Sequence, residues 1–147
     1  MAHRPVMLEE VLHALEPRDG GLYVDATFGA GGYTRAILGF HGTRVLGIDR
    51  DPTARRAVEA VKGAYPKRFA FAEGPFSLME DVIERAESSG VDGVVLDLGV
   101  SSMQIDEADR GFSFQREGPL DMRMSRSGPS AADAVNKLEL DELTAIF

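Results

Sequence analysis

A glycine-rich turn after a short apolar stretch is the feature of this sequence that most constrains its fold. The apolar stretch, Leu22 to Ala26, is typical of a buried strand, and Gly29, Gly31 and Gly32 follow it. A helix is expected from about Thr34 onward. Because glycine has no Cβ, such a turn brings backbone N–H groups and a helix N-terminus close to a ligand. The stretch therefore predicts a ligand-binding turn at the edge of an α/β sheet.

An acidic residue stands twenty positions after the first glycine of the turn. Asp49 ends the run Arg44–Asp49, which has the continuous apolar character of a strand buried in a parallel sheet. At this distance the second strand of a βαβ unit presents an acid to a ribose. The turn and Asp49 together predict a site for a nucleoside-containing cofactor.

The rest of the chain alternates between apolar runs and amphipathic stretches, which predicts parallel strands joined by right-handed crossovers. Ser88-Ser89-Gly90 is expected to end one of the helices. Residues that suit the start of a helix are Asp51 before Pro52, and two capping boxes, Ser77 with Glu80 and Ser130 with Asp133. The expected strands are 22–26, 44–49, 68–72 and 91–98, and the expected helices begin near 8, 34, 52, 78, 131 and 141.

The segment from Gly99 to Gly128 has no clear period, and a structureless loop of this length is either functional or disordered. It is too apolar for plain disorder, so we expect an ordered functional loop. Four strands followed by an apolar helix leave an open sheet edge. This pattern suggests a piece of a longer protein, and the edge could pair two copies into a dimer.

Composition excludes several classes of protein. The chain has 147 residues, no Cys and three His, so a disulfide framework and a multi-histidine metal site are not expected. No apolar run approaches the ~20 residues of a membrane helix, and a cytoplasmic protein without membrane contact fits best. The net charge of −8 argues against nonspecific binding of a phosphate backbone over the whole surface. It leaves room for nucleic acid at one local site.

Two cofactors compete for the glycine turn. The dinucleotide fingerprint needs a third glycine or alanine, and Thr34 stands there instead. A site for S-adenosylmethionine is less demanding: it needs acids after the first two strands, an apolar residue after the third and a polar group after the fourth. Asp25, Asp49, Phe76 and Asp97 fill these positions in order. S-adenosylmethionine is therefore the predicted cofactor, with Asp25 either contacting it or bracing the turn.

The string after the fourth strand lies where a methyl acceptor would bind. Asp97, together with the carbonyl of Leu98 or Gly99, could accept both hydrogens of an exocyclic amine and favour a pyramidal nitrogen. Ser101 and Ser102 could orient the base. In the alternative interpretation, Asp97 contacts only the cofactor and the serines cap a turn.

Two aromatic residues and a cation lie further along the loop. Phe112 and Phe114 could stack on bases, and Arg110 could bind a phosphate. A small hydrophobic cluster that pins the loop is the alternative for one of the two Phe. The arginines of the loop are balanced by acids, so the loop is not a basic patch.

Several motifs of the chain are long and specific: His3 with Pro5-Val6, and residues 25–32, 49–52, 97–102, 110–114 and 118–124. These motifs closely resemble those of the bacterial family of 16S ribosomal RNA cytosine-N4 methyltransferases (small-subunit methyltransferase H). The resemblance implies methyl transfer from S-adenosylmethionine to the N4 amine of a decoding-site cytidine in the small ribosomal subunit. It also implies a Rossmann-like methyltransferase domain with a helical domain inserted after the fourth strand.

Carried over by position, the resemblance implies a set of cofactor-binding residues. The set is Gly31, Gly32, Tyr33, Asp49, Phe76, Asp97 and Gln104. The family often has His-Ser in place of Tyr33-Thr34, and Pro in place of Met103. Backbone contacts of the turn would survive the first change, whereas the second leaves Gln104 less rigidly placed.

By resemblance, the family chain is about twice as long as this one. Residues 1–100 are therefore expected to form an incomplete cofactor-binding domain, and residues 101–147 a functional loop and the start of the helical insertion. We expect the whole protein to methylate RNA and these 147 residues alone to bind the cofactor weakly and not to methylate. A half-domain of an NAD-dependent oxidoreductase and a non-catalytic cofactor-binding module are the alternatives.

Overall fold

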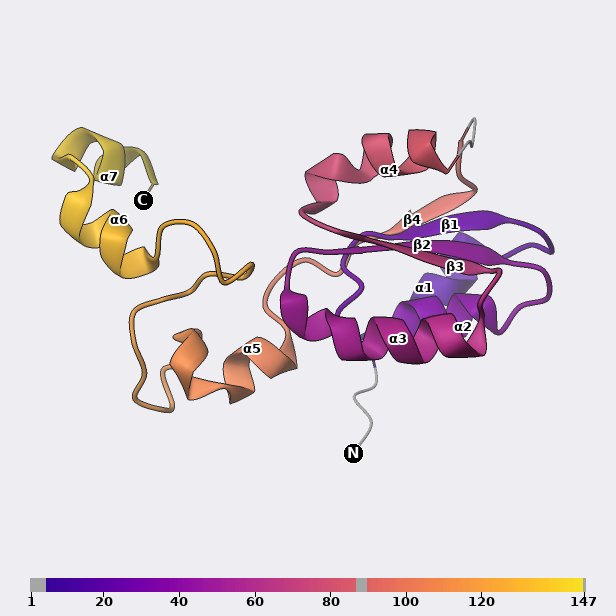
Figure 1. The fold of residues 1–147 in the computed structure, drawn as a ribbon, viewed down its shortest axis with the longest axis horizontal. Coiled ribbons are helices and arrows are strands. Elements are labelled where there is room, and N and C mark those ends of the chain that lie inside the picture. Colours follow the sequence, from indigo (N-terminus) through magenta and orange to yellow (C-terminus); the bar gives the residue numbers. More distant parts are fainter. Residues whose placement is uncertain (1–4, 87–89, 147) are drawn as a thin grey trace. The chain divides into compact units, whose positions relative to one another are not determined.

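The computed structural model describes residues 5–86 and 90–146, so His3 and the predicted break at Ser88-Ser89 lie outside the described part. The chain divides into two compact units, Met1–Leu98 and Gly99–Phe147, and each is described by itself. In Figure 1 the first unit runs from indigo to rose and the second from orange to yellow. Within the described ranges, no helix is both long and apolar enough to cross a membrane.

The first unit is built on a four-stranded parallel sheet with the order β3-β2-β1-β4. This confirms the predicted α/β class. The predicted fourth strand, 91–98, is wrong in extent, because β4 lies at the edge and pairs with β1 over only three residues. The strands are β1 (Leu22–Asp25), β2 (Arg44–Asp49), β3 (Phe69–Glu73) and β4 (Gly93–Val95).

Helices cover both faces of this sheet, as Figure 1 shows: α1, α2 and α3 lie on one face and α4 on the other. Side chains alternate along each strand, so that Tyr23 packs toward α1–α3 whereas Leu22 and Val24 pack toward α4. Two apolar layers result, one on each face. The helices are α1 (Leu8–Leu15), α2 (Gly32–Leu38), α3 (Arg55–Ala64) and α4 (Met79–Arg85).

One of the two predicted helix starts in this unit is confirmed. The Asp51 side chain accepts a hydrogen bond of 2.9 Å from the Thr53 N–H, and the 3-10 turn Pro52–Ala54 leads into α3. The predicted capping box of Ser77 with Glu80 is wrong. The chain enters a 3-10 turn directly after Pro75, so that Ser77 lies inside the turn and no side-chain cap forms.

A close approach of aromatic rings requires a glycine in β2. The Phe28 ring stacks on Phe69 with centroids 5.4 Å apart and meets Phe71 edge-on at 5.5 Å. A Cβ at Gly47 would lie 2.9 Å from both Phe28 and Phe69. The buried Phe28 ring therefore packs directly against the backbone of β2 at Gly47, and it also lies against the glycine turn at Gly31.

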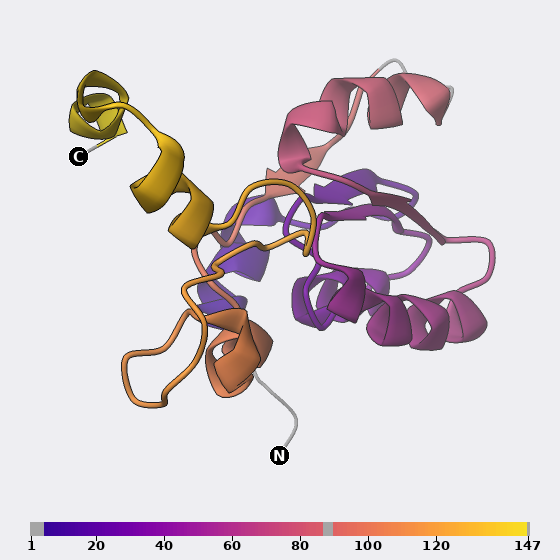
Figure 2. The same cartoon turned by 60° about the vertical axis from the view of Figure 1, so that its left-hand side comes forward.

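The second unit contains more helix than the sequence predicts. The segment 99–128 was expected to be an ordered loop without regular structure, yet it contains α5 (Ser102–Asp106) and a 3-10 turn (Ala108–Arg110). These elements are shorter than a hydrophobic period, so periodicity cannot reveal them. The predicted capping box of Ser130 with Asp133 is confirmed at the start of α6 (Ala131–Lys137), and α7 (Leu140–Ile146) follows. Figure 2 shows these helices from a second side.

Candidate cofactor-binding site

The carboxyl ends of all four strands meet at one edge of the sheet. The register pairs Asp25 with Gly47 on one side and with Val95 on the other, and it pairs Asp49 with Glu73. From β1 the chain adds β2 and then β3 on one side of the sheet, and it then crosses to add β4 on the other side of β1. The direction in which strands are added therefore reverses beside β1. Open α/β sheets bind ligands in the crevice at such a switch point.

The glycine turn leaves β1 at this point. Gly29 and Gly31 have φ values of 51° and 74°, in the left-handed region that favours glycine. A Cβ at Gly31 would lie 2.8 Å from the Phe28 ring. On the outer side, Arg35 donates to the carbonyls of Ala30 (2.5 Å) and Gly31 (3.2 Å). The turn is thus held from below by an aromatic ring and from outside by a guanidinium.

Asp49 lies at the end of β2 and holds the first glycine of the turn. One carboxylate oxygen accepts from the Gly29 N–H at 2.6 Å, and the other accepts from the Asp51 N–H at 2.8 Å. Burial raises the pKa of Asp49, and these backbone hydrogen bonds oppose the rise. Each oxygen accepts one hydrogen bond here and has a second lone pair for a ligand hydroxyl.

Asp25 ends β1 and is completely buried, with 0% of its surface exposed. One carboxylate oxygen accepts from both the N–H (3.2 Å) and the hydroxyl (2.6 Å) of Thr34. Burial raises the pKa of Asp25 to about 6, although the hydrogen bonds from Thr34 oppose the rise. Of the two roles considered for Asp25, the described contacts are those of bracing the turn.

Tyr33 connects the turn to the segment before α1. Its hydroxyl donates to the carbonyl of Val6, and Pro5 packs so closely on Gly32 that a Cβ there would collide with the proline ring. Burial raises the pKa of Tyr33, and the charges of Asp97 and Asp25 raise it further. The three acidic groups Tyr33, Asp25 and Asp97 therefore lie near one another.

Two further predicted site residues are exposed at this edge. Asp97 follows β4, and its N–H donates to the Thr27 hydroxyl at 2.8 Å, while the residue itself is exposed. Phe76 follows β3 and is 48% exposed. The segment before Phe76 is tied to β2, because the Gly74 N–H donates to the Asp49 carbonyl at 2.8 Å.

The first unit thus brings together six of the predicted cofactor-binding residues. They are Gly31, Gly32, Tyr33, Asp49, Phe76 and Asp97. Thr27 and Thr34 also hold the turn, and no sequence pattern predicted these roles. The available signal was Thr34 itself, which stands where a dinucleotide fingerprint has glycine.

The remaining predicted residues lie in the second unit, where Ser101 and Gln104 form a capping box. The Ser101 hydroxyl accepts from the Gln104 N–H at 3.2 Å, and the Gln104 side chain accepts from the Ser101 N–H at 2.9 Å. Ser102 is the first residue of α5. Ser101 therefore caps the start of α5, as the alternative interpretation of the serines predicted. Catalytic roles for Ser101 and Ser102 stay predictions.

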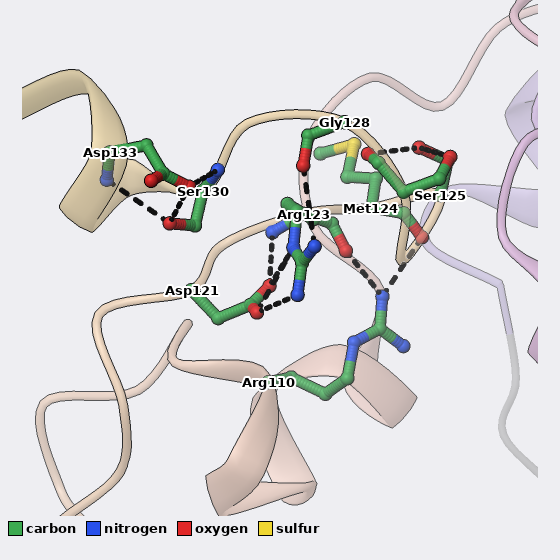
Figure 3. Close-up of polar contacts among 9 residues, drawn as sticks. Arg110, Asp121, Arg123, Met124, Ser125, Gly128, Ser130 and Asp133 are labelled. Atoms are coloured by element: carbon green, nitrogen blue, oxygen red, sulfur yellow. Dashed lines mark hydrogen bonds and ion pairs between the residues drawn. The ribbon is translucent and has the colours of Figure 1, made fainter. Parts of the chain in front are cut away.

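A network of arginines organises the loop that follows, as Figure 3 shows. Arg110 is only 4% exposed and donates to the carbonyls of Arg123 (3.1 Å) and Met124 (2.9 Å). A buried guanidinium with two carbonyl acceptors has little surface left for a phosphate. Arg110 therefore holds the loop in this structure, and the predicted phosphate contact stays a prediction.

Further ion pairs complete this network. Arg123 binds Asp121 with its Nε and Nη2 atoms, which lowers the pKa of Asp121 to about 2. Arg126 donates to Glu107 at 2.6 Å. A cavity of about 340 Å³ lies within this network and is lined by residues 107–110, Asp121, Arg123 and Arg126. The arginines that line this cavity donate hydrogen bonds to carbonyls and carboxylates of the same loop. We therefore assign the cavity to the packing of the loop.

The two aromatic residues of the loop differ in exposure. Phe112 is partly buried, and the Arg110 guanidinium lies 5.8 Å from its ring centroid. Phe114 is fully exposed, at 108%. Phe112 therefore belongs to the packed part of the loop, which was the alternative considered for one of the two, whereas Phe114 is free to stack.

No group of three or more His, Asp or Glu among residues 5–86 and 90–146 could hold a metal ion.

A parallel sheet with a glycine turn at its switch point gives the first unit a Rossmann-like α/β fold. Comparison with known proteins then identifies the family. The model of the MraW methylase family matches residues 1–147, and the chain belongs to this family.

Similar curated proteins carry one name. The chain is 60% identical over 145 residues to "Ribosomal RNA small subunit methyltransferase H" of Maricaulis maris (strain MCS10), covering 99% of the chain and 43% of that protein. It is 57% identical over 147 residues to the proteins of the same name from Brucella suis and Brucella canis, covering 42% of each. The chain therefore spans less than half the length of these relatives.

Proposed function

We propose that this chain forms the methyl-donor site of an S-adenosylmethionine-dependent methyltransferase that acts on the N4 amine of a cytidine in the 16S RNA of the small ribosomal subunit. The carrying observation is a glycine turn, flanked by Asp49 and Asp97 at the switch point of the sheet, in a chain of a methylase family. The relatives' name supports ribosomal RNA as substrate. The cytidine and its N4 amine rest on the motif resemblance.

The residues at the switch point suit an adenosyl ligand. The free lone pairs of Asp49 are acceptors for ribose hydroxyls, and the half-exposed ring of Phe76 offers a face for adenine. Gly31 and Gly32 let the backbone approach the amino-acid part of the ligand. Thr34, held by Asp25, occupies the place where a dinucleotide site needs glycine, which disfavours NAD.

Methyl transfer to an exocyclic amine requires groups that accept the hydrogens of the amine. S-adenosylmethionine supplies a methyl group activated by its sulfonium. The exposed carboxylate of Asp97, with the carbonyl of Leu98 or Gly99, accepts the two amine hydrogens and takes up the released proton. Because Asp97 is anchored through its N–H to Thr27, its backbone keeps a fixed position relative to the glycine turn.

Residues of the second unit complete the proposal. We assign cofactor binding to residues 1–100 and substrate recognition to residues 101–147. Gln104 is the proposed cofactor contact in the second unit, Ser101 and Ser102 orient the base, and Phe114 stacks on RNA. The net charge of −8 means that affinity for RNA depends on such local contacts.

Two measurements test this function. Calorimetry with S-adenosylmethionine, S-adenosylhomocysteine and NAD is expected to show binding of the two adenosyl ligands only. NAD binding without the others would instead support an oxidoreductase half-domain.

The second measurement uses a protein of the relatives' full length, tritiated S-adenosylmethionine and small subunits that lack the methyl group. Label in 16S RNA is expected, and it should be lost in Asp97→Ala. No label, despite cofactor binding, would favour a non-catalytic binding module. This chain alone serves as the comparison and is expected to give no label.

A further inference from the structure

A buried acid–threonine pair lies directly beneath the glycine turn. Asp25 and Thr34 both have 0% of their surface exposed, and a single oxygen of Asp25 accepts the N–H and the hydroxyl of Thr34. Thr34 lies in the first turn of α2, two residues after Gly32. The pair therefore fixes where the helix begins relative to the end of β1, and the turn between them has little freedom.

The residues that follow Asp25 are connected to the far side of the crevice. The Thr27 hydroxyl, two residues after Asp25, accepts a hydrogen bond of 2.8 Å from the N–H of Asp97. Asp25 thus lies between the glycine turn and the segment that carries Asp97. Asp25 is therefore linked to the glycine turn through Thr34, and the neighbouring Thr27 is linked to the segment that carries Asp97.

We propose that Asp25 is a positioning residue for the adenosyl-binding turn, and that its ionisation makes the affinity of the turn for adenosyl ligands depend on pH. This inference rests on the proposed function, because it concerns the same ligand. The ionised carboxylate, which only accepts hydrogen bonds, holds the turn in its binding conformation.

Protonation of Asp25 would weaken its hydrogen bonds with Thr34. Both hydrogen bonds from Thr34 end on one oxygen of Asp25, and the other oxygen is buried without a hydrogen-bond partner and would receive the proton. A neutral carboxyl accepts hydrogen bonds less strongly than a carboxylate, so protonation loosens the hold of Asp25 on Thr34. The raised pKa of Asp25, about 6, places this change close to neutral pH. The titratable groups that face Asp25 from the neighbouring elements are Asp49 at the end of β2 and Tyr33 in α2, and Asp97 faces Tyr33.

The test is calorimetry of S-adenosylhomocysteine binding at pH 7.5 and pH 5.0. This ligand lacks the sulfonium charge, so a change in affinity reports the turn and not a direct attraction between charges. If only the ionised form binds, a pKa of about 6 predicts about tenfold weaker binding at pH 5.0. Binding at pH 6.0 should also release protons, which is visible as a dependence of the heat on the buffer.

Matched variants separate Asp25 from the other acids. Asp25→Asn keeps the shape and should abolish the pH dependence, although Asp49 and Asp97 remain. Thr34→Val, which removes only the hydroxyl, should weaken binding about tenfold at pH 7.5, whereas Thr34→Ser should bind like the parent chain. Circular dichroism of each variant checks that it is folded, and the two threonine variants still test the proposal if Asp25→Asn fails to fold.

The outcomes are distinct for the two claims. A parent chain that binds neither adenosyl ligand overturns the proposed function. A parent chain that binds S-adenosylhomocysteine equally at both pH values overturns the inference alone. The inference alone is also overturned if Asp25→Asn keeps the pH dependence of the parent chain, or if Thr34→Val binds S-adenosylhomocysteine as tightly as the parent chain does.

Discussion

The carboxylate of Asp49 accepts a hydrogen bond of 2.6 Å from the backbone N–H of Gly29, across the gap between the ends of β2 and β1. The acid proposed to bind the ribose therefore also fixes the entry of the glycine turn. A second acid, Asp25, fixes its exit through Thr34. Two acids from neighbouring strands therefore hold the two ends of one turn.

Replacement of Asp49 should weaken adenosyl binding. Asp49→Ala removes the acceptor for the Gly29 N–H and the proposed ribose contact, so we expect a loss of about 1.5–3 kcal/mol, or about 10- to 100-fold in Kd. Calorimetry with S-adenosylhomocysteine measures it. Asp19→Ala is the control, since that acid is exposed and pairs with His41. Equal affinities of the two variants would contradict the role of Asp49.

The glycine in β2 should be irreplaceable. Gly47→Ala places a Cβ 2.9 Å from the rings of Phe28 and Phe69 and should lower the free energy of unfolding by about 1–3 kcal/mol. Gly63→Ala, in α3 with no atom within 4 Å of the new Cβ, should instead raise it by about 0.5–1 kcal/mol. Urea denaturation measures both. A stable Gly47→Ala variant would show that the ring cluster can shift.

Stability should depend on the ionisation of Asp25. Its pKa is raised from the ordinary 3.8 to about 6, so the folded chain binds the proton more tightly than the unfolded chain. This contribution is complete below pH 3.8 and is lost as the pH rises through about 6, for a total of about 3 kcal/mol. Urea denaturation between pH 4 and 7 should show a smaller decrease for Asp25→Asn than for the parent chain. Identical profiles would contradict the raised pKa.

Substitutions of Ser101 can distinguish a role as the cap of α5 from a role in methyl transfer. Ser101→Ala should destabilise α5 by about 1 kcal/mol and lower methyl transfer in the full-length protein, because Gln104 lies in that helix. Ser101→Asp retains a capping oxygen and should restore most of the transfer if the cap is what matters. Transfer that stays as low as in Ser101→Ala would show that the hydroxyl itself takes part. Ser102→Ala, without a capping bond, serves as the comparison.

The two aromatic residues of the loop should separate RNA binding from stability. Phe114→Ala should weaken binding of 16S RNA by the full-length protein by about 1–3 kcal/mol, with unfolding unchanged, because the ring is fully exposed. Phe112→Ala should lower stability instead, since its ring packs beside the buried Arg110. Filter binding and urea denaturation distinguish the two. RNA binding unaffected by Phe114→Ala would remove this residue from the proposed RNA contacts.

The local elements follow closely from the sequence because short-range patterns dictate them. The alternation of apolar runs and glycine turns predicts β1, β2, α1 and α2 within a few residues, and the Ser130–Asp133 spacing predicts a helix start. Where a neighbour in space matters, prediction is weaker. The extent of β4 depends on how far β1 runs beside it, and the missing cap at Ser77 depends on where Pro75 starts the turn.

By itself, the sequence determined the class of fold, the position of the glycine turn and the acids that surround it, because strand ends in a parallel sheet place such residues at one edge. The tertiary structure decided what each polar group does there. Only burial shows that Asp25 braces the turn through Thr34 and that Arg110 holds its own loop. A buried polar group must find partners that lie far away in the chain, and no local pattern specifies which partners they are.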